Sequence, residues 1–374
     1  MKLSRSLIRI VSIALALVLV SCSTPQNKDQ NIKIGIIASQ TGAAAEQGQS
    51  WLKGALLAYS LLDQSESPVE LFIEDDSTEA KSAVSAFQSL STVSKVDAVI
   101  GGTWDFLALS IIPLSEAANI PLIMPSNPIE LYSKYLNDRH NLLVTGLSLA
   151  AEKEALSQLI IDKKWKTVAV IVVDVPYGLS HGDMVGEISA NSDLKIVYSS
   201  KFSLLSNYAD ELKVRVAQAR ASNPDFIFCV TDAVGVDLVL KELEKDPPLI
   251  PLVVTQHLEN AFKVSGSAAR YKEAYGIYPK LEDPSFIELY KAQYEEAPKV
   301  YAAEGFDALN FAYRTALVRK NSTRGKDLFP MKGVTGQFEY PPINNQPVKV
   351  KAEMMTTKNG VFESVELSKP MVSR

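Results

Sequence analysis

Short apolar runs, bounded by glycine, proline or polar residues, alternate with helix-like stretches along the chain from residue 32 to residue 255. Such runs are typical of the buried strands of a parallel sheet, and their alternation with helices predicts an α/β fold. The predicted strands are residues 32–39, 69–74, 98–100, 122–124, 167–174, 194–200, 226–231 and 251–255. The predicted helices are residues 50–62, a helix that ends at Val93, 152–163, 183–191, 208–221 and 235–245.

Residues 95–128 are the clearest unit of this pattern, because they read as strand, tight loop, helix, strand and loop. A right-handed crossover puts both strands in one sheet, so the two loops open at the same edge, where ligands of open α/β sheets bind. The polar and aromatic side chains of these loops are therefore expected to face a crevice, with turn formation or core packing as the alternative role. They are Thr103, Trp104, Ser126 and Asn127.

Aspartates stand just ahead of two predicted helices. Asp76, or Ser77 beside it, is expected to cap the helix that ends at Val93, and Asp105 is expected to cap the helix that follows it. A metal-binding or acid–base role for Asp75 and Asp76 is the alternative.

The second half of the chain repeats the arrangement of the first. The segments that follow its predicted strands carry polar or aromatic side chains, and the one after residue 174 is expected to be a loop that leads into the helix 183–191. The side chains are Tyr177, Thr231, Asp232, Gln256 and His257. From residue 285 the pattern is mostly helical, and from residue 333 it is β-rich with turn signals at Asn344-Asn345 and Asn359-Gly360.

Length and composition describe an ordinary soluble protein with more than one core. A chain of 374 residues exceeds what one hydrophobic core usually organises, so two domains are expected. Hydrophobic residues make up 47% and charged residues 22% of the chain, and the net charge is −5. This negative charge gives no reason to expect a nucleic-acid partner.

Residues 1–21 have the features of a secretory signal peptide, with a basic start and an apolar run that is too short to remain in a bilayer. The end of this segment, Leu19-Val20-Ser21-Cys22, resembles the bacterial lipobox. That resemblance implies lipidation of Cys22, with residues 22–31 as a polar tether, and an ordinary signal cleaved elsewhere is the alternative. With Cys22 acylated, Cys229 has no partner for a disulfide, and its apolar surroundings predict a buried strand thiol.

The usual catalytic patterns are absent. The chain contains no GxGxxG after the first strand, no GxxxxGK[ST], no GxSxG, no HExxH and no CxxC. Its three histidines, His140, His181 and His257, lack the spacing of metal ligands. We therefore expect neither an enzyme nor a cofactor or metal, and a Rossmann-like dehydrogenase is disfavoured because residues 40–47 lack the glycine spacing that cradles phosphate.

Several segments together resemble the leucine/isoleucine/valine-binding family of extracytoplasmic solute-binding proteins, which serve ABC importers. The resemblance covers residues 31–365, and it is carried by six segments together with the Tyr177-Gly178 turn. The segments are IKIGIIASQTGAAAEQG, IEDDSTEAKSAVSAFQSL, AVIGG, IIPLSEAANIPLIMPSNP, DPSFIELYKAQYEEAPKVYAAEGFDAL and GVTGQFEY.

The resemblance implies a type I periplasmic-binding fold: two Rossmann-like lobes with parallel central sheets, joined by three crossover strands, that close over a ligand. The first lobe is expected to comprise residues 32–148 and 278–335, and the second residues 149–277 and 336–374. The crossovers are expected near residues 146–150, 275–280 and 333–340.

The family's ligand contacts carry over to particular positions of this chain. Gln47 falls in the first loop that meets the ligand side chain, and Thr103 and Ser126 fall near two hydroxyls of the first lobe. Tyr177 matches the second-lobe tyrosine, and Thr231 or Asp232 lies in the next lining loop. Gln256 or His257 stands where amino-acid binders carry an acid for the ammonium group.

Two departures from the family pattern change the expected ligand. Trp104, Asp105 and Phe106 replace the family's run of Ser and Thr, and no acid is present at Gln256-His257. Either Asp232 substitutes for that acid or the ligand is not an α-amino acid, in which case a Trp in the cleft suits an aromatic or flat amide solute.

The resemblance thus implies a monomeric, lipid-anchored receptor that binds an amino acid, amide or small organic acid and delivers it to ABC permease subunits. The alternative is a ligand-sensing or regulatory envelope lipoprotein of the same fold without a transport role. Permease and ATPase genes beside this gene would favour transport.

Overall fold

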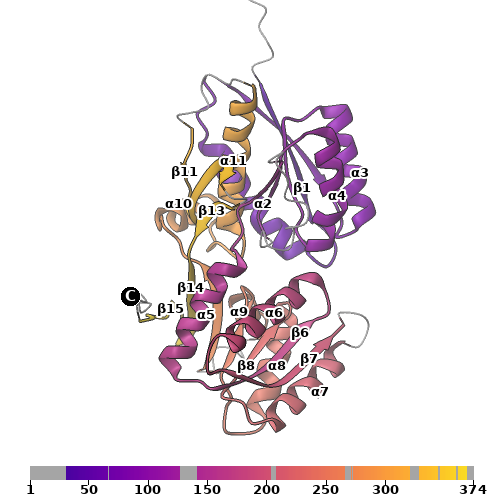
Figure 1. The fold of residues 1–374 in the computed structure, drawn as a ribbon. Coiled ribbons are helices and arrows are strands. Elements are labelled where there is room, and N and C mark those ends of the chain that lie inside the picture. Colours follow the sequence, from indigo (N-terminus) through magenta and orange to yellow (C-terminus); the bar gives the residue numbers. More distant parts are fainter. Residues whose placement is uncertain are drawn as a thin grey trace, which may run out of the picture.

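The computed structural model describes residues 31–65, 67–126, 141–203, 208–265, 271, 273–320, 328–343, 346–358 and 361–368. This part of the chain forms two α/β lobes stacked end to end (Figure 1). The signal peptide and lipidated tether expected before Asn31 lie outside the described residues, as does Asn127.

The first lobe is built on a five-stranded sheet in which every strand is parallel to its neighbours. In spatial order the strands are β2 (Val69–Asp75), β1 (Ile32–Ala38), β3 (Ala98–Gly101), β4 (Leu122–Met124) and β5 (Leu142–Val144). The helical segments of this lobe are α2 (Ala45–Leu61), α3 (Ala80–Ser89), the π-helical turn η1 (Leu90–Ser94), α4 (Asp105–Ala118), α10 (Ser285–Tyr294) and α11 (Ala302–Lys320).

Both faces of this sheet are buried, as the continuous apolar runs predict. Successive side chains of a strand point to opposite faces, so Ile34 and Ile36 of β1 share a core with Trp51 of α2, whereas Ile37 packs in the core that contains Phe87 of α3. Helices α2 and α11 lie on one side of the sheet and α3 and α4 on the other (Figure 1).

The second lobe is built on a seven-stranded sheet. Its pairings are parallel except for those made by the two strands that come last along the chain. In spatial order the strands are β15 (Val361–Ser364), β14 (Ala352–Lys358), β10 (Ala274–Pro279), β9 (Leu252–Val254), β8 (Phe226–Val230), β6 (Thr167–Val173) and β7 (Lys195–Phe202). Its helices are α5 (Leu149–Lys163), α6 (Pro176–Ala190), α7 (Tyr208–Ala221), α8 (Ala233–Glu244) and α9 (Leu258–Ser265).

Three passages link the lobes, and the last one differs from the expected position. The chain passes between the lobes after β5 and after β10, near the expected residues. Residues 333–340, however, join a small antiparallel sheet of β11 (Met331–Lys332), β12 (Gly336–Ile343) and β13 (Gln346–Val350). Phe338 of β12 packs against Phe311 of α11, so this sheet belongs with the first lobe, and the chain returns to the second lobe between β13 and β14.

Two helix starts also differ from the sequence prediction. Helix α6 begins at Pro176, well before residue 183, because proline is favoured at the first helical position, and Tyr177 therefore lies in a helix rather than a loop. Helix α3 begins at Ala80, and neither Asp76 nor Ser77 caps it. Asp76 instead accepts hydrogen bonds from the Ser39 hydroxyl at 2.6 Å and the Thr78 N–H at 2.9 Å, which ties the loop after β1 to the loop after β2.

Cys229 lies fully buried in β8, as its apolar surroundings predict. Burial, with a smaller contribution from the charge of Asp232, raises the pKa of the Cys229 thiol to about 12. Because the thiolate is the reactive form, we expect iodoacetamide to label Cys229 only after denaturant is added. Rapid labelling of the native protein, followed by mass spectrometry, would contradict this placement.

No helix in the described ranges combines the length and hydropathy that crossing a membrane requires.

Candidate ligand-binding site

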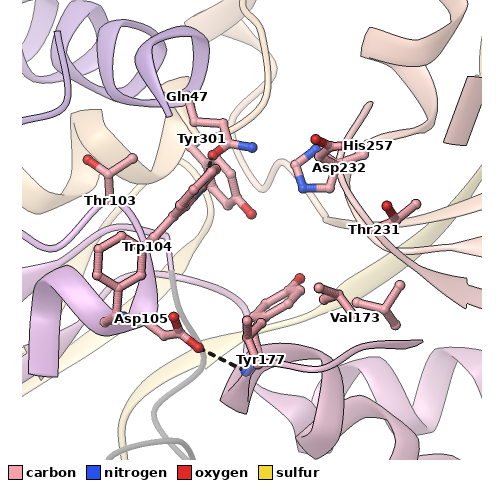
Figure 2. Close-up of a pocket in the computed structure, with 13 residues that line it drawn as sticks. Gln47, Thr103, Trp104, Asp105, Val173, Tyr177, Thr231, Asp232, His257 and Tyr301 are labelled. Carbon is pink, nitrogen blue, oxygen red and sulfur yellow. Dashed lines mark hydrogen bonds between the residues drawn. The ribbon is translucent and has the colours of Figure 1, made fainter. Parts of the chain in front are cut away.

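A cavity of about 250 Å³ lies where the two lobes face each other, at the carboxyl ends of their parallel strands (Figure 2). This is the edge at which open α/β sheets bind ligands. Both lobes contribute to its wall. The lining residues are Gln47, Thr103, Trp104, Asp105, Phe106 and Tyr301 from the first lobe, and Val173, Val175, Tyr177, Val230, Thr231, Asp232 and His257 from the second.

The loop after β3 forms part of the first-lobe wall, and two hydroxyl groups hold it in place. Gly102 has a φ of 84°, a left-handed conformation that glycine adopts without steric cost. The Thr103 Oγ1 accepts hydrogen bonds from the Ser39 N–H and the Trp51 Nε1–H, both at 3.2 Å. The Ser126 hydroxyl donates to the Thr103 carbonyl oxygen at 2.9 Å. Ser126 does not line the cavity, and Thr103 directs its oxygen toward the protein, so both hydroxyls position the loop.

Trp104 and Gln47 form a joined part of the wall. The Trp104 Nε1–H donates to the Gln47 Oε1, which connects the loop after β3 to the first turn of α2. The edge of the neighbouring Phe106 ring contacts the half-buried Trp104 ring, with 6.1 Å between the ring centroids. The Trp104 indole is therefore held by its own neighbours and presents aromatic surface to the cavity (Figure 2).

Asp105 links the two lobes directly. It is the first residue of α4 rather than its cap, and its Oδ1 accepts from the N–H of Phe106 at 2.7 Å. Its Oδ2 accepts from the N–H of Tyr177, in the first turn of α6 on the other lobe, at 3.0 Å (Figure 2). Burial raises the pKa of Asp105, while these two hydrogen bonds act in the opposite direction.

Tyr177 packs against His181, which forms a buried polar pair with Glu152 that was not predicted from the sequence. Its ring lies 4.3 Å from the His181 ring, and the His181 Nδ1 is 2.7 Å from the Tyr177 carbonyl oxygen. The His181 Nε2 lies 3.1 Å from the Glu152 Oε2, and both side chains are buried. Burial, with contributions from Tyr301 and Glu152, raises the pKa of Tyr177 well above its usual range, so its phenol remains neutral at physiological pH.

The second-lobe wall presents polar atoms with no protein partner among the described residues. The Thr231 Oγ1 and the His257 Nδ1 are buried and accept or donate no hydrogen bond there. Burial lowers the pKa of His257 to about 4, against the opposing charge of Asp232, so the imidazole is neutral at pH 7. Gln256 is buried behind the wall and does not line the cavity.

Tyr301, which no sequence pattern marked as a site residue, completes the wall from the position just before α11. Its φ of 69° is a left-handed conformation that non-glycine residues seldom adopt and that occurs preferentially at functional sites. The only signal for it was its place in the segment YAAEGFDAL, which supports the family resemblance. The valines Val173, Val175 and Val230 were missed because each ends or follows a strand of the structure without a polar group to mark it.

The cavity has the composition of a small-molecule binding site. Aromatic and aliphatic side chains dominate its wall, with a few convergent polar groups that can orient a ligand. Within the described ranges no group of three or more His, Cys, Asp or Glu side chains is placed to hold a metal ion.

The fold has close relatives among solved structures. The substrate-binding protein LivJ of a branched-chain amino acid transporter from Streptococcus pneumoniae, in complex with isoleucine, is 22% identical, with a TM-score of 0.76 over 91% of this chain and 100% of that one. The leucine-binding protein LivK from Thermotoga maritima is 16% identical, with a TM-score of 0.75 over 91% and 99%. An ABC-transporter solute-binding protein from R. palustris, in complex with benzoate, is 16% identical, with a TM-score of 0.75 over 92% and 98%.

The TM-scores establish a shared fold, which confirms the type I periplasmic-binding fold expected from the sequence. No curated protein sequence matches the chain significantly. The family model described as periplasmic binding protein, in contrast, matches residues 31–325, well over half of the chain. The chain therefore belongs to the periplasmic binding protein family.

Proposed function

We propose that the protein is an extracytoplasmic, lipid-anchored receptor of an ABC importer, which closes its two lobes around a small organic solute. The observation that carries this proposal is the cavity itself, because its wall is divided between the lobes and neither lobe encloses it alone. Membership of the periplasmic binding protein family supports both the extracytoplasmic location and the binding role.

Closure follows from a ligand that contacts both lobes. Such a ligand binds the closed form better than the open one, and this difference in affinity is all that it contributes to closure. A preference of roughly 10⁴-fold carries a mostly open population to a mostly closed one. The hydrogen bond between Asp105 and the Tyr177 N–H joins the two lobes, and we expect it to break when they open.

The test is small-angle scattering together with calorimetry, on a panel of free amino acids, amides, organic acids and amines. We expect the compound with the highest affinity to make the protein more compact. Binding that leaves the radius of gyration unchanged would contradict closure, and failure of every compound to bind would remove the support for a receptor.

Replacement of Tyr177 by alanine is expected to weaken binding of that compound by about 1–3 kcal/mol, which is roughly fivefold to more than a hundredfold. Tyr177 lies in the first turn of α6 and contributes no strand to the core, so the fold should remain intact. Calorimetry measures the loss, and Tyr198→Ala, at a half-buried tyrosine of the same lobe outside the cavity, is the matched control. Equal affinity of wild type and Tyr177→Ala would make Tyr177 a bystander.

The lipid anchor is a separate expectation, carried by the Leu19-Val20-Ser21-Cys22 motif. We expect the wild-type protein to sediment with membranes and Cys22→Ala to be released or to retain an uncleaved signal peptide of altered mobility. Several acyl chains hold a protein firmly on a bilayer, whereas one chain binds only marginally. A Cys22→Ala protein that stays membrane-bound with unchanged mobility would show that the motif is not a lipidation site.

A further inference from the structure

We propose that the solute of this cavity is an organic ammonium ion with an aromatic or aliphatic body and no carboxylate group. This inference rests on the proposed function, since it names the class of solute for the same cavity. It departs from the amino acid, amide or small organic acid that the family resemblance implies.

The charged groups on the cavity wall are acids alone. Asp105 enters from the first lobe and Asp232 from the second, and no lysine or arginine is among the lining residues that the structure describes. His257 is the one basic side chain there, and its imidazole is neutral at pH 7 because burial lowers its pKa. An ammonium ion placed between the two carboxylates gains attraction from both lobes, whereas a carboxylate is repelled by both.

The helix starts at the cavity, which ordinarily attract anions, are already occupied by the protein's own carboxylates. Asp105 accepts hydrogen bonds from the N–H groups of Phe106 in α4 and Tyr177 in α6. Asp232 caps α8 by accepting from the N–H of Gly235 at 2.7 Å. A ligand carboxylate would therefore meet an acid where it needs a donor, and this disfavours α-amino acids as well as simple organic acids.

The aromatic rings of the wall add a second attraction for a cation. Trp104 and Tyr301 from the first lobe and Tyr177 from the second surround the cavity, and Figure 2 shows both tyrosine hydroxyls directed into it. The face of an aromatic ring attracts an organic cation, most strongly where water is excluded. The same rings, together with Val173 and Val230 of the second lobe, provide apolar surface for the body of the solute.

The second-lobe wall supplies acceptors for N–H groups. The buried Thr231 Oγ1 and the buried His257 Nδ1 line the cavity without a hydrogen-bond partner in the described part of the protein. A hydroxyl oxygen accepts, and the His257 Nδ1 accepts as well in the tautomer that carries its proton on Nε2. A protonated amine presents donors to these atoms.

Calorimetry with four compounds that share a phenylethyl body tests the charge directly: phenethylamine, L-phenylalanine, 3-phenylpropanoate and 3-phenylpropanamide. We expect phenethylamine to bind at least tenfold more tightly than each of the other three. Tighter or equal binding of the amide would overturn the required charge, and tighter or equal binding of phenylalanine or the acid would overturn the exclusion of carboxylates. Failure of phenethylamine to bind would overturn the proposal as well.

Two isosteric variants identify the groups responsible. Asp105→Asn and Asp232→Asn are each expected to weaken phenethylamine binding at least tenfold and to reduce the discrimination against 3-phenylpropanoate. Asp210→Asn is the matched control, because Asp210 is an exposed acid in the first turn of α7 outside the cavity, and it should bind as wild type does. The melting temperature of each variant shows whether its fold is intact. Wild-type affinity in both cavity variants would overturn the proposal.

Small-angle scattering with the same compounds separates this inference from the proposed function. Compaction with phenethylamine supports both. Compaction with phenylalanine or 3-phenylpropanoate alone supports a closing receptor and overturns the ammonium class. Binding of phenethylamine without compaction supports the ammonium class and contradicts closure.

Discussion

The Gly305→Ala protein is expected to lose about 1–3 kcal/mol of its free energy of unfolding, although only one methyl group is added. A Cβ at position 305 would lie 2.0 Å from the carbonyl oxygen of Trp51, and a Cβ at Gly54 would lie 1.8 Å from that of Ala302. Helices α2 and α11 thus approach each other through a glycine on each side. The obstacle is backbone rather than a flexible side chain, so the helices must separate to admit the methyl group.

Urea unfolding followed by circular dichroism measures this loss, and Gly186→Ala is the matched control. Gly186 is also inside a helix, but a Cβ there would meet nothing within 4 Å. Replacement of a helical glycine by alanine at an open position adds up to about 1 kcal/mol of stability. If the two variants are equally stable, the close contact between α2 and α11 does not exist.

This contact also matters for the ligand-binding cavity, because Tyr301, which lines the cavity, immediately precedes the first residue of α11. The helix comes from the part of the chain after residue 300, yet it packs on α2 from the start of the chain. The packing of α11 against α2 therefore sets where the Tyr301 ring enters the cavity. We expect Gly305→Ala to weaken solute binding in addition to stability.

The sheets of both lobes were predictable from the sequence because their strands are continuous apolar runs. Residues 98–100, 122–124 and 226–230 have no polar position to place on a solvent face, so they had to be central strands. The return of the chain to the second lobe was not predictable. Residues 336–358 form a hairpin followed by a further strand, and the hydrophobic alternation that predicts strands does not tell which sheet each joins.

The cavity was predictable in its position but only partly in its wall. Loops at the carboxyl ends of parallel strands had to converge, and seven of the ten predicted residues line the cavity: Gln47, Thr103, Trp104, Tyr177, Thr231, Asp232 and His257. The direction of a hydroxyl is set by its hydrogen-bond partners. Thr103 turns toward Ser39 and Trp51, which lie far from it in the sequence, and no local pattern contains that information.

Asp105 was interpreted as a helix cap because an acid ahead of a helix usually is one. Its contact with Tyr177 depends on how the lobes face each other, and the separation of 72 positions along the chain hides it. The sequence did contain the relevant anomaly, since an acid replaces the hydroxyl-rich run of the family. In the structure, the Asp105 carboxylate accepts hydrogen bonds from N–H groups at the starts of two helices.

Stability is expected to fall as the pH rises from about 4.5 to 8, because of Glu304 in α11. Burial raises the pKa of this carboxyl from 4.5 to about 8, and its Oε1 has no hydrogen-bond partner in the described residues. The folded protein therefore holds a proton that the unfolded chain releases in this range. Since the folded state binds more protons, each pH unit costs up to about 1.4 kcal/mol of stability, and the full window amounts to several kcal/mol.

The Glu304→Gln variant should remove most of this dependence and should be more stable than wild type at pH 8.5 but similar to it at pH 5. Asp307, whose pKa burial raises to about 6, contributes a dependence of the same sign that the variant retains. Urea unfolding at the two pH values measures both effects, with Glu288→Gln, at an exposed acid of α10, as the control. A wild-type protein equally stable at pH 5 and pH 8.5 would mean that the Glu304 carboxylate finds a compensating partner when it ionises.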